Sequence, residues 1–367
     1  MEAGEAAALR ELRAAMREAL AGLPGGGEAR REGGGGGGGG FERAGVWDAL
    51  AAACQAASRA ATQLSLAASG PARAWPPQEG RGASGAGPGA SPRRALLRPQ
   101  ELQWLSGEAQ RSVRAAGAAC RGLPAEQGRT LGAAVRRAVA GLAEGMLRLS
   151  EALLRAPAPE SSGPERLVST GAVWEACERL AGLPRDNQAA VAAAVASALA
   201  VVKDAVEEME QALAEGGDPG RDPLEDEEMG SGGDRDVCWT EAERQLLGPC
   251  MGLVKAAKAC LKKLLGAVKA QGRVDTAEQV AQLDDLAEAA GDVSPSVDEL
   301  VLSTYPPVNQ LTLRLNAGKL ASVLKKVLEI VRASHVCVPS EESWVQFLAG
   351  AIDHNMDKIK DFTQGAL

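Results

Sequence analysis

The sequence predicts an all-α protein built from up-and-down antiparallel helical bundles that an acidic disordered linker joins. Apolar residues recur at intervals of three and four along most of the chain, which is the spacing of amphipathic helices. No stretch alternates β-branched and polar residues as a half-buried strand would. Segments rich in glycine, proline or acidic residues separate the helical stretches and mark the connections.

The first half of the chain carries several apolar stripes. The last of them follows alanine-rich sequence, and Leu199 lies near its middle, so we expect Leu199 to be a core anchor. Short connections such as residues 123–128 and 183–187 favour antiparallel neighbours. The stripes occupy residues 47–68, 102–120, 131–153 and 191–213, the second of them being weaker because it contains Gly107 and Gly117.

The second half begins with a capping signal. Thr240 followed by Glu243 fits a capping box, and Trp239 stands in front as a staple residue. Pro249 lies inside the helix that follows, so that helix either kinks or restarts there. Further helices are expected over residues 280–286, 308–331 and 340–362.

A heptad spacing occurs in the helix expected over residues 308–331. Leu313, Leu320 and Val327 are seven residues apart, which fits a zipper between chains. The same spacing also fits the core of a bundle within one chain. We favour the bundle and take Leu313 and Leu320 as core anchors.

The linkers predict the domain organisation. A run of eight glycines, residues 33–40, and an acidic segment that includes residues 225–228 cannot bury enough apolar surface to order themselves. The expected map has four parts: residues 1–41 as a short helix plus disordered polyglycine; 42–215 as an N-terminal bundle with a flexible insert at 70–94; 216–237 as the acidic linker; and 238–367 as a C-terminal bundle.

Composition excludes several classes of function. The 367 residues carry 40 Lys and Arg against 48 Asp and Glu, a net charge of -8, and only 3% aromatic residues, so direct nucleic-acid binding is not expected. The longest apolar run, residues 189–202, is short of the roughly 20 residues that cross a bilayer. The acidic N-terminus does not resemble a signal peptide. Seven cysteines without CxxC spacing indicate reduced thiols that mostly act as small apolar side chains.

Catalytic and metal-binding patterns are also lacking. His335 and His354 are the only histidines, and their spacing fits no metal motif. His354 with Asp353 and Asp357 is better explained as a surface group than as a ligand set. The adjacent carboxylates Asp284 and Asp285 point about 100° apart on a helix and form no paired site. We therefore expect no enzyme activity, no cofactor and no metal.

Candidate interaction and modification sites remain. Lys255, Lys258 and Lys262 share one helix face; this lysine row is either a solvated surface or a binding face for an acidic partner. Ser91, followed by Pro92 and two arginines, fits the substrate pattern of proline-directed kinases. Ser294 also precedes a proline but lacks the following basic residue, so it is the poorer candidate.

Several collinear stretches resemble the cyclin-D1-binding protein 1 (Grap2 and cyclin-D-interacting protein) family. The resemblance covers most of residues 168–367 and is weaker over residues 42–154. Its clearest stretches read VWEAC (173–177), LPRDN (183–187), KDAVEEMEQA (203–212), KACLKK (258–263), QVAQLDD (279–285), SPSVDEL (294–300), YPP (305–307), SVLKK (322–326) and AIDH (351–354).

The resemblance implies a non-enzymatic regulator of nucleus and cytoplasm. Its expected partners are D-type cyclin, the adaptor protein Grap2 and helix-loop-helix transcription factors. It implies negative regulation of the cell cycle, with less phosphorylation of the retinoblastoma protein and less E2F-dependent transcription, and an Id-like dominant-negative role. The residues themselves leave an alternative open, because alanine-rich amphipathic bundles are also common in cytoskeletal and adhesion-type scaffolds.

Overall fold

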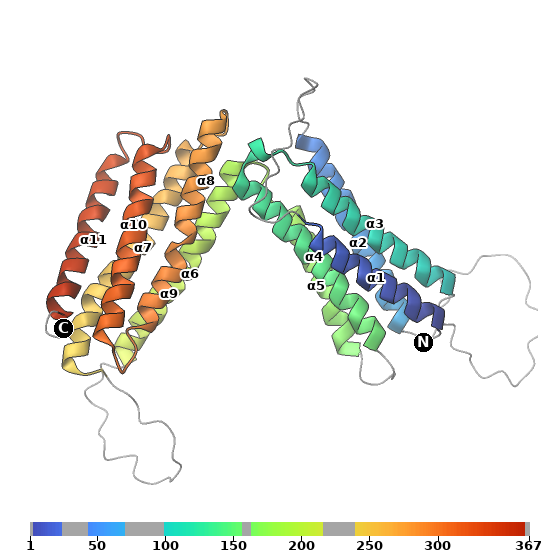
Figure 1. Ribbon diagram of the computed structural model, residues 1–367, viewed down its shortest axis with the longest axis horizontal. Helices are drawn as coiled ribbons and strands as arrows, with labels where there is room; N and C mark the ends of the chain where they lie inside the picture. The colour runs from blue at the N-terminus through green and yellow to red at the C-terminus, as the bar shows by residue number, and fades with distance from the viewer. Residues whose placement is uncertain (1–2, 24–42, 70–98, 156–162, 216–238, 364–367) are drawn as a thin grey trace, which may run out of the picture. The chain divides into compact units, whose positions relative to one another are not determined.

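The computed structural model describes residues 3–23, 43–69, 99–155, 163–215 and 239–363. Within these ranges every regular element is a helix, which confirms the all-α class (Figure 1). The predicted polyglycine, the insert at 70–94 and the acidic linker at 216–237 lie outside the described residues. The described helices form two compact units, each with its own core.

The first unit comprises residues 1–125 and 132–183. Helix α2 packs against both α3 and α5, and α1 packs against α3. Gly145 of α4 lies so close to α5 that an added Cβ would be 3.3 Å from the Cα of Val173, so a small residue is needed there. The elements are α1 (Ala3–Ala21), α2 (Arg43–Ser69), α3 (Pro99–Arg121), α5 (Gly163–Ala181) and α4 (Arg129–Arg155) from Gly132 onward. A 3-10 turn (Ala125–Gln127) precedes α4, and residues 126–131 belong to the second unit.

The second unit comprises residues 126–131 and 184–367. Helix α6 packs against α7, α8 and α9, while α11 packs against α7 and α10. Their inward residues form one apolar cluster that runs from Val191 to Ile359. The helices are α6 (Asn187–Glu215), α7 (Glu241–Gln271), α8 (Ala277–Gly291), α9 (Val293–Leu302), α10 (Gln310–Ala333) and α11 (Glu342–Thr363).

The structural boundary between the units differs from the boundary expected at the acidic linker. The chain divides at Leu183 and Pro184, so α6 belongs with the C-terminal helices. The reason is that its apolar stripe, including Val195, Val202 and Met209, is buried in the cluster of the second unit. Helix α1 also departs from the expected map: Leu12 and Met16 are fully buried, which makes α1 part of the first unit's core.

The helix starts follow the capping chemistry in the sequence. The Thr240 side chain accepts a hydrogen bond from the Glu243 backbone, and the Glu243 side chain accepts one from Thr240, so the predicted capping box is confirmed. Thr276 and Gln279 form a second capping box at α8. Pro249 lies within α7 without dividing it into two helices.

Helix α6 is the one helix among the described residues that is long and apolar enough to cross a membrane. Length and composition alone do not separate a spanning helix from a core helix. Here Val191, Val195 and Val202 are fully buried against the other helices of the second unit, which accounts for the apolar composition of α6.

Candidate functional site

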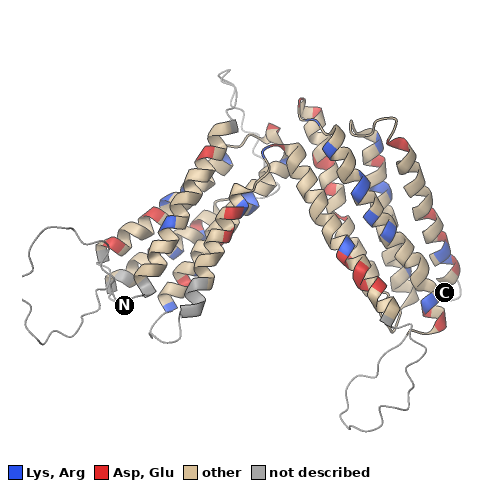
Figure 2. Ribbon diagram, turned by 180° about the vertical axis from the view of Figure 1, so that it is seen from behind, with Lys and Arg blue, Asp and Glu red and all other residues tan. Residues whose placement is uncertain are grey.

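The lysine row lies on α7, next to the acidic end of α6. Lys255 Nζ is 2.7 Å from Glu210 Oε1, and both side chains are about half exposed. The hydrogen bond from Lys255, followed by the positive charges of Lys255 and Lys258, lowers the pKa of Glu210. The acidic neighbour of Lys255 is therefore on α6. Lys258 is half-buried and Lys262 is exposed. Figure 2 shows acidic and basic residues distributed over the helices of this unit.

An apolar surface lies where α9 ends and α10 begins. Leu302, Leu311 and Leu315 are 70%, 54% and 65% exposed; we call these three residues the leucine surface. Glu299 of α9 fixes the two helices against each other, because its backbone oxygen accepts a hydrogen bond from Asn316 at 2.9 Å and its carboxylate pairs with Lys319 at 2.6 Å. This pairing brings the end of α9 beside the first turns of α10. Leu311 and Leu315 are one helical turn apart on α10, and exposed apolar residues that share a helix face suit a protein-binding surface.

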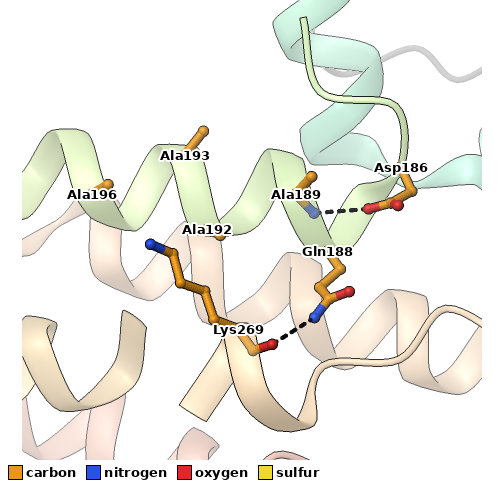
Figure 3. Close-up of a pocket in the computed structure, with 7 residues that line it drawn as sticks. All are labelled: Asp186, Gln188, Ala189, Ala192, Ala193, Ala196 and Lys269. Carbon is orange, nitrogen blue, oxygen red and sulfur yellow. Dashed lines mark hydrogen bonds between the residues drawn. The ribbon is translucent and has the colours of Figure 1, made fainter. Parts of the chain in front are cut away.

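A shallow groove of about 420 Å³ follows the alanine face of α6 (Figure 3). Gln188 Nε2 donates to the backbone oxygens of Val268 at 2.9 Å and Lys269 at 3.2 Å, which ties the start of α6 to the end of α7. Asp186 Oδ1 accepts from the Ala189 backbone at 2.8 Å. The polar groups at the end of this groove are thus engaged in helix capping and anchoring.

The adjacent carboxylates of α8 have separate roles, as expected from their directions on the helix. Asp284, whose side chain is 4% exposed, accepts hydrogen bonds from the backbone N–H groups of Arg129 and Thr130. Asn187 completes this buried group: its Nδ2 donates to Asp284 at 2.9 Å and its Oδ1 accepts from the Leu131 backbone at 3.0 Å. Asp285 is exposed and pairs with the Arg129 guanidinium at 2.8 Å. The group caps the first turn of α4.

The remaining predicted residues lie mostly in the core. Leu313 and Leu320 are fully buried, as is Val327, so the heptad faces the interior of the second unit. Leu199 was expected to anchor the first bundle; it is instead half-buried and packs on the core of the second unit. Ser294 is half-buried in the first turn of α9. Ser91 lies outside the described residues.

The acidic residues near His354 are engaged in ion pairs. Asp353 pairs with Lys325 at 2.5 Å, and Asp357 pairs with Lys360 at 2.9 Å. Across the described ranges, no group of three or more histidine, cysteine, aspartate or glutamate side chains is arranged to hold a metal ion. The exposed leucines and lysines are among the features of this unit that suit contact with another macromolecule, as is the exposed Phe347 of α11.

The leucine surface was not found by sequence reasoning. Leu311 and Leu315 are four residues apart and lie off the stripe that contains Leu313 and Leu320. Leu311 and Leu315 have helical spacing on the polar side of an amphipathic helix, and this pattern could have indicated an exposed apolar surface.

These features define a helical-bundle protein with exposed surfaces suited to protein binding. Two protein-family models match the chain. The model described as Grap2 and cyclin-D-interacting, N-terminal, matches residues 49–215, and the model described as Grap2 and cyclin-D-interacting, C-terminal, matches residues 224–329. The chain belongs to this family, as the resemblance implied. The two matches meet near the acidic segment, whereas the structural units divide at Leu183 and Pro184.

Relatives in several vertebrates share most of the chain. It is 48% identical over 321 residues to the Cyclin-D1-binding protein 1 homolog of Xenopus laevis, which covers 88% of this chain and 90% of that protein. It is 47% identical to the homolog of Danio rerio, over 65% of this chain and 70% of that protein. It is 42% identical to Cyclin-D1-binding protein 1 of Homo sapiens, over 74% of this chain and 78% of that protein.

Proposed function

We propose that this chain binds D-type cyclin without catalysing a reaction and thereby restrains cell-cycle progression. The observation that carries the proposal is the 48% identity, over 88% of the chain, to a protein whose name states cyclin-D1 binding. In this proposal, binding lowers phosphorylation of the retinoblastoma protein by the cyclin-dependent kinase and so lowers E2F-dependent transcription. The protein acts in both cytoplasm and nucleus.

We place the cyclin contact on the leucine surface. Binding energy at protein interfaces is concentrated in a few side chains that become fully desolvated, whereas exposed lysines mainly affect the rate of encounter. Leu302, Leu311 and Leu315 are exposed and lie on two helices that Glu299 holds together. The lysine row is assigned the lesser role of attracting an acidic region of the partner.

The test measures binding of the purified full chain to a purified D-type cyclin. Replacing Leu311 and Leu315 with serine should weaken binding at least tenfold, since each loses a desolvated apolar contact. Replacing Lys258 and Lys262 with glutamate should mainly slow association, with the difference shrinking at high salt. If the serine variant binds the cyclin as tightly as the wild-type chain does, the cyclin contact lies outside the leucine surface. A wild-type chain that does not bind any D-type cyclin would overturn the proposed function itself.

The regulatory part of the proposal has its own readout. Adding the chain to an active D-type cyclin–kinase complex should lower phosphate transfer to the retinoblastoma protein, and the serine variant should do so less. If the wild-type chain and the serine variant inhibit the kinase equally, inhibition does not depend on the leucine surface. If the chain binds the cyclin but phosphorylation of the retinoblastoma protein is not lowered, the inhibitory role is wrong and the binding function stands.

Two other functions are less well supported. An Id-like zipper would need Leu313, Leu320 and Val327 to face another chain, yet all three are fully buried in the bundle. A cytoskeletal scaffold would be indicated by co-sedimentation of the chain with actin filaments. No relative described above carries a name that refers to either role.

A further inference from the structure

Two cysteines that are far apart in the sequence come together in the first unit. Cys54 lies on α2 and Cys177 on α5, and the two positions are 123 residues apart. The Cys177 thiol donates to the backbone oxygen of Cys54 across 3.4 Å. Cys54 is buried and Cys177 is half-buried, so the pair lies at the edge of the core rather than deep within it.

Other cross-helix contacts hold the two thiols in this position. The Trp174 indole donates to the Thr62 hydroxyl at 3.2 Å, and the Ser65 hydroxyl hydrogen-bonds to that of Thr170. The order of these contacts shows that α2 and α5 are antiparallel, since positions increase on one helix as they decrease on the other. The geometry around the pair is therefore determined by several side chains on both helices.

We propose that Cys54 and Cys177 form a reversible disulfide when the protein meets a hydroperoxide. The thiolate of one cysteine attacks a peroxide oxygen and forms a sulfenic acid, and the other peroxide oxygen leaves as hydroxide, which takes up a proton to become water. The second thiol then attacks the sulfenic sulfur, the S–S bond forms and a second water leaves. The two thiols are oxidised and one hydrogen peroxide is reduced to two waters.

The electrostatic state of the pair indicates which sulfur reacts first. A side-chain interaction with the Cys177 thiol, distinct from that thiol's hydrogen bond to the Cys54 backbone oxygen, lowers the pKa of Cys54, although burial acts in the opposite direction. The same side-chain interaction, together with burial, raises the pKa of Cys177. Because the thiolate is the nucleophile, Cys54 is the sulfur that attacks the peroxide and Cys177 is the resolving thiol.

The other described cysteines lack this arrangement. Burial raises the pKa of Cys250 and Cys260 to about 12, so they are held as thiols inside the second unit. Burial also raises the pKa of Cys120 in the first unit and of Cys337 in the second. Cys120 is a suitable control, since it belongs to the same unit as the pair and is buried on a different helix.

The experiment oxidises the reduced full chain with hydrogen peroxide in modest excess, blocks the remaining thiols and maps tryptic peptides without reductant. Peptides 44–59 and 167–179 each contain one cysteine, so the proposal predicts a cross-linked product of these two that dithiothreitol releases. The cross-link should persist in Cys120→Ser and be absent from Cys54→Ser and Cys177→Ser. It should also raise the melting temperature of the first unit, by roughly 10 °C, because it closes a long loop.

The wild-type peptide map alone can overturn the proposal, so the result does not depend on the folding of a variant. Oxidation that appears only at other cysteines, or only as disulfides between chains, would show that the pair is not reactive. If Cys54 and Cys177 are both alkylated after peroxide treatment while Cys337 is oxidised, the same conclusion follows.

Discussion

Asp284 accepts two hydrogen bonds from Thr130, one from the backbone N–H at 2.9 Å and one from the hydroxyl at 2.7 Å. The carboxylate belongs to α8 and the donors to the first turn of α4, which packs with the second unit. Unpaired N–H groups at a helix start favour a negative charge, so the buried carboxylate is stabilised here rather than placed for chemistry. Asn187 supports the same turn from α6.

Replacing Asp284 with alanine should destabilise the second unit strongly. The change leaves the partly buried N–H groups of Arg129 and Thr130 without their acceptor, and we expect a loss of about 2–4 kcal/mol in the free energy of unfolding. Asp285→Ala is the matched control, because Asp285 is exposed and its pair with Arg129 should contribute less than about 1 kcal/mol. Urea unfolding of both variants measures the difference. Equal midpoints would show that the cap contributes no more than a surface ion pair.

Gly128 should not tolerate a side chain. Its φ is +109°, which L residues rarely adopt, and an added Cβ would overlap the Asn187 amide that contacts Leu131 and Asp284. We expect Gly128→Ala to cost about 2–4 kcal/mol. Gly132→Ala, one turn into α4 with open space around it, should be neutral or stabilising by up to about 1 kcal/mol. Thermal unfolding of the two variants measures the difference. Similar melting temperatures would contradict the argument that the positive φ of Gly128 and the nearby Asn187 amide exclude a side chain.

The helices could be predicted from the sequence because apolar spacing is a local property. The stripe ending at Leu213 became α6, and the capping box at Thr240 began α7. The helix against which each apolar stripe packs can be far away in the sequence. The spacing of apolar residues therefore did not indicate that α6 packs with the C-terminal helices. For the same reason Leu199 was taken as a full core residue, although Val195 and Val202 on either side of it carry the burial.

The candidate sites were harder to predict because they depend on contacts between distant residues. No spacing rule connects Cys54 with Cys177 or Asp284 with Thr130, which meet only after the helices pack. The leucine surface required knowing which face of α10 is outward. Sequence reasoning identified the lysine row as a face, but only the structure shows that Lys255 pairs with Glu210 of α6.

Truncating the buried leucines of α10 should destabilise the second unit much more than truncating the exposed leucines of the same helix. Leu313 and Leu320 are fully buried, so replacing both with alanine should lower the stability of the second unit by about 4–10 kcal/mol, enough to unfold it. Leu311 and Leu315 are exposed on the same helix, and the same double change there should shift stability by less than about 1 kcal/mol. Circular dichroism during heating measures both. An inner double variant that melts like wild type yet loses a helix-loop-helix partner would instead support a zipper between chains.

We expect His335 to make the second unit sensitive to mild acid. Its Nε2 accepts from the Arg273 backbone N–H at 3.0 Å, while Nδ1 lies 2.7 Å from the Gln282 side-chain oxygen, to which it donates. The contact with Arg273 requires the neutral ring, because both nitrogens of a protonated ring are donors; the donation from Nδ1 to Gln282 survives protonation. Burial, and then the positive charge of Arg273, lower the pKa of His335 below its usual value of about 6.5.

The direction of the pH effect follows from that lowered pKa. The unfolded chain takes up a proton near pH 6.5, whereas the folded chain resists it until a lower pH, so stability is full above about 6.5 and declines as pH falls toward the folded pKa. Because the ring is partly exposed, the decline should be less than about 1 kcal/mol. His335→Gln keeps an acceptor for Arg273 without titrating, so its unfolding free energy should change less between about pH 7.5 and 5.5. Parallel pH profiles for the two proteins would show that His335 does not control this dependence.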